Sequence, residues 1–172
     1  MKCFLLTFVV LLGLCAVSRA SGPVAFSAGL TRHVTAAPNS KIVYDTVFTN
    51  VGGDYNPSTG SFICRTPGLY LFSVSGLSQE DKNIYLSLHV NNRATITVYS
   101  SAKYKFTGSS NNVVLKVNKN DEVNVVAQGS TALYGKIDQV YATFTGILMT
   151  EIQETFVNPV SDNSNSSCAC WP

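Results

Sequence analysis

The stretch YDTVFTNVGGDYNPSTGSFICRTPGLYLF, residues 44–72, sets aromatic residues at fixed distances around a segment rich in turn residues. Gly52-Gly53 and Asn56-Pro57 lie in that segment, and both pairs favour tight turns. The stretch leads into residues 69–77, where Tyr70, Phe72 and Val74 share one face and Ser73 and Ser75 lie on the other, with the two-residue period of a strand. It therefore predicts short strands joined by tight turns.

The same pattern continues through residues 24–151, and helical spacing is not sustained anywhere after residue 20. The predicted strands are rich in Val, Ile, Thr, Tyr and Phe, which fit a pleated surface. They cover residues 24–30, 42–49, 60–65, 69–77, 84–91, 94–99, 112–117, 122–127 and 140–150, and a turn is predicted at residues 108–110. About nine short strands at this spacing indicate an all-β sandwich, with a jelly roll as the expected topology.

Several predicted strands have one apolar face for the core and a second face of mixed character. The mixed face contains Leu69, Tyr85 and Ile147 and is more apolar than a face in contact with solvent needs to be. An interface with another copy of the chain would explain this composition.

Residues 1–20 have the features of a secretory signal peptide. Lys2 precedes a short apolar segment, and the small residues Ser18 and Ala20 precede a cleavage position before Ser21. The alternative is a signal anchor, but the apolar segment is short for a bilayer span. We therefore expect the chain to be exported, with an extracellular, secreted mature form.

The charge balance argues against two classes of partner. Without Lys2 and Arg19, the 12 basic side chains fall to 10, which equals the 10 acidic side chains. The positive charges are scattered rather than clustered, so neither nucleic acid nor insertion into a membrane is expected.

The sequence contains no pattern typical of an enzyme. His33 and His89 are the only histidines, no His/Cys/Asp cluster has metal-ligand spacing, and no Gly-x-Ser-x-Gly motif is present. Both histidines are expected to be surface or interface residues, and neither a catalytic site nor a metal site is predicted.

The spacing of the opening stretch resembles the signature of the C1q globular domain. That signature is filled by seven residues here: Tyr44, Asn50, Tyr55, Phe62, Gly68, Tyr70 and Phe72. Residues 24–28 and the segment containing Phe144 and Gly146 are similar to the family's opening and closing strands. Two departures are that Tyr44 replaces the usual Phe and that Val74 stands where the signature ends in an aromatic residue.

The resemblance implies a ten-stranded jelly roll, similar to the tumour necrosis factor fold, that assembles as a homotrimer and performs no chemistry. It places the domain at residues 21–154, between the signal peptide and an Asn/Ser-rich tail at 155–172. The family's collagen stalk is not found in this sequence, as in secreted invertebrate forms that serve as lectin-like pattern recognition proteins in innate immunity. Calcium is implied by the resemblance alone, and no other cofactor is expected.

Two connections carry the candidate ligand-binding residues. Tyrosine rings stack on sugar faces, and lysines bind carboxylates or phosphates. The candidates are Tyr99, Lys103, Tyr104 and Lys105 in one connection and Tyr134, Lys136 and Asp138 in the other. Solvated loops are the alternative for both connections.

Three cysteines remain after the signal peptide, so they cannot all pair within one chain. Cys64 alternates in phase with Phe62 and is expected to be a buried free thiol. Cys168 and Cys170 either close a strained local loop or crosslink the tails of neighbouring protomers. Asn165 begins the Asn-Ser-Ser sequon, a candidate glycosylation site.

The sequence thus predicts a secreted recognition protein that binds carbohydrate or microbial surfaces multivalently. Two other classes stay open: an extracellular structural network built through the tail cysteines, and a signalling ligand for a cell-surface receptor.

Overall fold

The structure is a computed structural model that describes residues 22–101, 103 and 105–152. Its regular elements within these residues are all strands. They are β1 (Ala25–Gly29), β2 (Val34–Ala36), β3 (Thr46–Val51), β4 (Tyr55–Asn56), β5 (Ser61–Ile63), β6 (Gly68–Leu77), β7 (Ile84–Val90), β8 (Arg93–Ser100), β9 (Gly108–Val117), β10 (Glu122–Ala127), β11 (Thr131–Leu133) and β12 (Thr143–Glu151).

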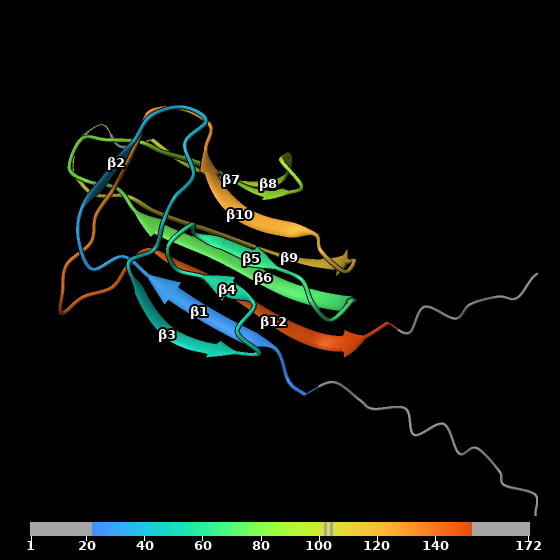
Figure 1. The fold of residues 1–172 in the computed structure, drawn as a ribbon. Helices are drawn as coiled ribbons and strands as arrows, with labels where there is room; N and C mark the ends of the chain where they lie inside the picture. Colours follow the sequence, from blue (N-terminus) through green and yellow to red (C-terminus); the bar gives the residue numbers. More distant parts are fainter. Residues whose placement is uncertain (1–21, 102, 104, 153–172) are drawn as a thin grey trace, which may run out of the picture.

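Two antiparallel sheets of five strands each form a sandwich (Figure 1). The first sheet has the order β3-β1-β12-β6-β9, and the second has the order β4-β5-β10-β7-β8. A separate ribbon pairs β11 with β2. The non-consecutive neighbours are those of a jelly roll, so the predicted ten-stranded all-β sandwich is confirmed.

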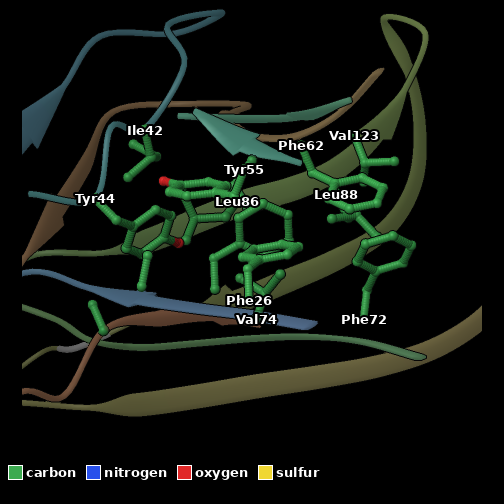
Figure 2. Packing of buried hydrophobic residues seen from close by; sticks show 14 of the residues in the cluster. Phe26, Ile42, Tyr44, Tyr55, Phe62, Phe72, Val74, Leu86, Leu88 and Val123 are labelled. Carbon is green, nitrogen blue, oxygen red and sulfur yellow. The ribbon is translucent and has the colours of Figure 1, made fainter. Parts of the chain in front are cut away.

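Aromatic rings fill the space between the sheets (Figure 2). Phe26 of β1 stacks on Tyr55 at 4.8 Å between ring centroids and meets the edge of Phe144 at the same distance. Phe62 lies 5.3 Å from both Phe26 and Tyr70. These rings come from both sheets, so the aromatic residues of the signature join the two layers into one core.

Asn50 and Gly68, the two non-aromatic signature residues, act through the backbone. The Asn50 side chain accepts a hydrogen bond from the Tyr55 amide at 3.2 Å and donates one to the Tyr55 carbonyl at 2.9 Å, which closes the turn between β3 and β4. Gly68 is the first residue of β6, and a Cβ there would overlap Leu148 and the carbonyl of Thr150. The close approach of β12, rather than a turn conformation, therefore requires this glycine.

Three features of the sequence-based assignment are wrong. Residues 108–110, predicted as a turn, begin β9, because β6 extends to Leu77 and pairs with Gly108. The strand predicted from residue 42 begins at Thr46, since the amide of Ile42 instead donates to the Val125 carbonyl at 2.8 Å. The strands β2, β4 and β11 were not predicted, because two or three residues carry no readable alternation.

The described chain begins and ends at the same end of the sandwich (Figure 1). The opposite end, which we call the distal end, is formed by the connections that follow β1, β6, β8 and β10 and precede β12. The β11–β2 ribbon also lies there.

Candidate functional site

Four rings from separate segments meet at the distal end. Tyr134 lies 4.5 Å from His33, 5.3 Å from Phe106 and 5.7 Å from Tyr141, measured between ring centroids. We call these four residues the distal aromatic cluster. Phe106 is 48% exposed and Tyr141 is 42% exposed, so the cluster presents aromatic surface to solvent.

A close backbone contact holds this cluster in place. His33 donates from Nδ1 to the Gly135 carbonyl at 2.8 Å. A Cβ at residue 135 would overlap the backbone of Arg32, so only glycine allows the two segments to approach. The next residues form a turn with a Lys136–Asp138 ion pair at 3.3 Å, and Ile137 at its tip is 85% exposed.

Tyr85 and Tyr99 form a second aromatic group on the outer surface of β7 and β8. Their rings meet edge to face at 5.4 Å, and both are exposed. Gly129 packs beneath Tyr85, where a Cβ would lie 3.1 Å from the Tyr85 ring. Gly129 therefore packs against the Tyr85 ring, and both tyrosine rings remain exposed to solvent.

The structure brings part of the predicted ligand set together. Phe106 follows Lys105 and contacts Tyr134, so the two predicted connections meet at the distal aromatic cluster. Tyr99 lies within β8 rather than in a connection, and its ring contacts Tyr85. Lys103 and Lys105 are exposed in the connection between β8 and β9, whereas Tyr104 lies outside the described residues.

Four aromatic members of these groups were missed from the sequence: His33, Tyr85, Phe106 and Tyr141. Phe106 is the one with a local signal, because a large apolar residue directly follows the lysine-rich segment. His33 is about 100 positions from Tyr134, so its contact depends on the β11–β2 pairing, which the sequence did not reveal.

A pocket with a volume of about 200 Å³ lies at the distal end between the β6–β7 connection and the β11–β2 ribbon. We call it the distal pocket, and its lining residues are Thr35, Asp81, Lys82, Asn83, Ser130 and Ala132. Ser130 follows Gly129, so the pocket is next to the Tyr85–Tyr99 pair. Asp81 is bonded to the amide of Lys105 at 3.1 Å, which links the pocket to the segment that precedes Phe106.

The outer face of the first sheet carries side chains in rows that cross all five strands. One row is entirely apolar and has the register Val51, Ala25, Ile147, Leu71 and Val114. The next row is polar, with the hydroxyls of Ser27 and Thr145 bonded at 2.9 Å. Exposures of 44% for Ile147 and 49% for Val114 show that the apolar row is open to solvent.

Cys64 is fully buried in the core and is a free thiol. Its Sγ and the Tyr70 hydroxyl both donate to the Thr66 carbonyl, at 3.1 and 2.7 Å. Burial raises the pKa of Cys64, so the unreactive thiol form is favoured. Cys168, Cys170 and Asn165 lie outside the described residues.

His89 lies on the outer face of β7 and its Nε2 is 2.8 Å from Nε2 of Gln128. Partial burial lowers the pKa of His89, which favours the neutral ring as the acceptor of that amide hydrogen bond. His89 therefore makes a structural hydrogen bond on the surface of the second sheet.

The described residues hold no group of three or more His, Cys, Asp and Glu side chains arranged to bind a metal ion. In the same residues, no helix has the length and hydropathy needed to cross a membrane.

Comparison with known proteins identifies the family. The C1q domain profile matches residues 25–149, so the chain belongs to the C1q domain family. Complement C1q tumor necrosis factor-related protein 3 of Mus musculus is 37% identical over 130 residues, which cover 74% of this chain and 52% of that protein. Heavy metal-binding protein HIP of Mytilus edulis is 30% identical over 128 residues, covering 73% of this chain and 60% of that protein. The chain spans about half the length of the curated relatives it matches.

Solved structures show the same fold. The globular domain of zebrafish complement 1qA protein has a TM-score of 0.61 at 20% identity and covers 76% of this chain and 100% of that one. Eiger TNF from S. frugiperda has a TM-score of 0.62 at 14% identity, with 77% and 96% covered. Domains of this family are non-enzymatic recognition and signalling modules, so the predicted absence of enzymatic activity is confirmed by family membership.

Proposed function

We propose that this chain is a secreted C1q-domain recognition protein that binds carbohydrate or microbial surface ligands in innate immunity. The observation that carries the proposal is the distal end, which holds both exposed aromatic rings and a small pocket lined by polar side chains. Aromatic faces pack against the apolar faces of sugars while polar groups bond their hydroxyls. The predicted candidates that the structure describes, Tyr99, Lys103, Lys105, Tyr134, Lys136 and Asp138, all belong to this end.

The active form in this proposal is a homotrimer. Its support is the apolar row on the outer face of the first sheet, which crosses five strands without a polar interruption. Burial of this row against neighbouring protomers would remove exposed apolar area from water. Three distal ends on one body would then bind a repetitive surface with an avidity above the affinity of each site.

The remaining segments fit an extracellular protein. Residues 1–20 act as a signal peptide and residues 21–154 as the domain, and Asn165 in the tail accepts a glycan. Cys168 and Cys170 crosslink tails of neighbouring protomers. Gel electrophoresis in denaturant without reductant tests the crosslink, since a band of monomer mass alone would contradict it.

A glycan array probed with the native secreted protein tests the recognition function. We expect saturable binding that free sugar competes away, and loss of binding when Tyr134 is changed to Ala. Lys119→Ala serves as a control because Lys119 is exposed in the turn between β9 and β10, away from the distal end. An array without any saturable signal would contradict the proposal and favour the two alternatives, a structural network or a receptor ligand.

A further inference from the structure

The polar side chains that line the distal pocket differ from those around it in their hydrogen bonding. Around it, hydroxyls are already bonded: Ser100 to Thr107 at 2.6 Å, and Thr131 to the Tyr85 carbonyl at 3.0 Å. Within the described part of the chain, by contrast, four of the five polar side chains that line the pocket make no hydrogen bond to the protein: Thr35, Lys82, Asn83 and Ser130. Polar side chains without a hydrogen-bond partner in the protein therefore line the distal pocket.

The backbone around the pocket is firmly held. The Ala132 amide donates to the Asn83 carbonyl at 3.1 Å, and the Ala132 carbonyl accepts from Gln79 at 2.9 Å. Lys82 donates its amide to the Gln79 carbonyl at 3.1 Å. The lining is thus positioned before any ligand arrives, which lowers the entropic cost of binding.

Asp81 forms one side of the pocket, and its backbone and one carboxylate oxygen are held by hydrogen bonds to Lys105. Its amide donates to the Lys105 carbonyl at 3.3 Å, and its Oδ1 accepts from the Lys105 amide at 3.1 Å. Both residues have positive φ angles, 56° for Asp81 and 110° for Lys105, in a region that non-glycine residues adopt rarely. Oδ2 of Asp81 is left to accept hydrogen bonds from a ligand.

Size and charge define the ligand. A volume of about 200 Å³ is below the range of roughly 300–1,000 Å³ for sites that enclose drug-sized molecules, so the pocket has room for one ring and not for an oligosaccharide. One carboxylate and one ammonium among the lining residues give no net charge. A carboxylate, an amide and two hydroxyls suit a compact polyol that carries both donors and acceptors.

We propose that the distal pocket binds one terminal, uncharged pyranose ring, with neighbouring sugar hydroxyls bonded to Asp81 and Asn83. This inference rests on the proposed carbohydrate-binding function and assigns it to residues that the aromatic candidates do not include. Ala132 forms the floor, is 5% exposed, and faces Thr35 across the β11–β2 ribbon. A small residue at this position leaves the space for the ring.

Ala132→Leu is the sharpest variant, because it fills the pocket without removing any backbone hydrogen bond. Asn83→Ala removes an amide from the wall, and Asp81→Asn keeps an acceptor for Lys105 while removing the charge. Lys119→Ala and Thr95→Val are matched controls, since both residues are exposed and neither lines the pocket. Circular dichroism and thermal unfolding establish that each variant is folded, and Asn83→Ala carries the test if Ala132→Leu does not fold.

The measurement is saturation-transfer NMR on the full secreted protein with methyl α-mannopyranoside, methyl β-galactopyranoside and N-acetylneuraminic acid as probes. We expect one of the uncharged pyranosides to bind, an affinity loss of at least about tenfold in Ala132→Leu and Asn83→Ala, and no change in the controls. If N-acetylneuraminic acid is the one probe that binds, and Lys82→Ala abolishes that binding, the proposal of an uncharged ligand is wrong.

The glycan array separates the two proposals. If the array is positive but neither pyranoside binds, or if the pocket variants bind as the wild-type protein does, the pocket is wrong and carbohydrate recognition stands. If the wild-type protein binds neither the array nor the free sugars, both proposals fail.

Discussion

Single residues in this fold are constrained mainly by how closely the two sheets approach. Gly146 of β12 shows the constraint most directly, because it lies between two core rings. A Cβ at this position would lie 2.8 Å from the Phe72 ring and would also overlap Phe26. The signature aromatics and the glycine of the closing strand are therefore one packing unit.

We predict that Gly146→Ala destabilises the protein by about 2–3 kcal/mol, the cost of forcing extra volume into a packed core. Urea unfolding followed by circular dichroism measures the change. Gly108→Ala is the control, because its nearest neighbour atom would be 3.7 Å away, and it should change the free energy of unfolding by less than about 0.5 kcal/mol. Equal effects of the two substitutions would contradict this account of the core.

Glu122 gives the fold a dependence on pH. A hydrogen bond from the Lys41 ammonium, followed by one from Ser61, holds the pKa of Glu122 below its ordinary value of 4.5. The folded protein thus binds fewer protons than the unfolded chain in this range. The contribution to stability is complete above pH 4.5 and disappears as the pH falls through the lowered pKa.

We therefore expect the free energy of unfolding of the wild-type protein to fall as the pH drops through the lowered pKa of Glu122, and Glu122→Gln to remove part of that fall. Urea unfolding at successive pH values provides the measurement. Glu80→Gln, which changes an exposed carboxylate in the β6–β7 connection, should leave the profile as it is. An unchanged profile in Glu122→Gln would show that the Lys41–Glu122 contact does not contribute.

At the scale of the elements, the sequence predicted long strands well and short strands poorly. Buried and half-buried residues alternate along all ten positions of β6, so its period was readable. The Gly-Ser-Ser sequence at residues 108–110 was interpreted as a turn, yet it forms the start of β9 because β9 pairs with β6 along its full length. The distal aromatic cluster was only half predicted for the same reason, because His33 reaches Tyr134 through a ribbon without local signal.

The β4–β5 hairpin depends on a glycine for two separate reasons. Gly60 has φ of 69°, and a Cβ there would also meet the backbone of Ile42 and Val43. Gly53 has a similar φ of 72°, but among the described residues a Cβ there would have just the Arg65 guanidinium near it, at 3.7 Å. Asparagine tolerates a positive φ. A Gly→Asn substitution therefore keeps the backbone conformation accessible and tests whether a Cβ would clash with neighbouring atoms.

We predict that Gly60→Asn costs more than about 2 kcal/mol, whereas Gly53→Asn costs less than about 1 kcal/mol. Chemical unfolding of both variants, compared with the wild-type protein, tests this difference. Similar losses would mean that the backbone angle, and not the contact with Ile42, makes Gly60 necessary.

For the whole molecule, the two outer faces of the sandwich have different roles in our proposal. The first sheet exposes the apolar row that contains Ile147, and the second exposes Thr95 on β8. A charge in the centre of a buried apolar interface is costly, whereas a charge on a solvated face is not.

We accordingly expect Ile147→Glu to convert a trimer into a folded monomer and Thr95→Glu to leave the assembly intact. Analytical ultracentrifugation gives the mass, and circular dichroism shows whether the monomer keeps its strands. A wild-type protein that sediments as a monomer would contradict the trimer, and a trimeric Ile147→Glu variant would place the interface elsewhere.

The position of the chain ends has a practical consequence. Strand β1 begins and strand β12 ends at the end of the sandwich opposite the distal end (Figure 1). A dye, a bead or a partner domain attached next to residue 22 or residue 152 would therefore leave the distal end unobstructed. The protein can be immobilised or labelled through its ends while every copy presents the same surface outward.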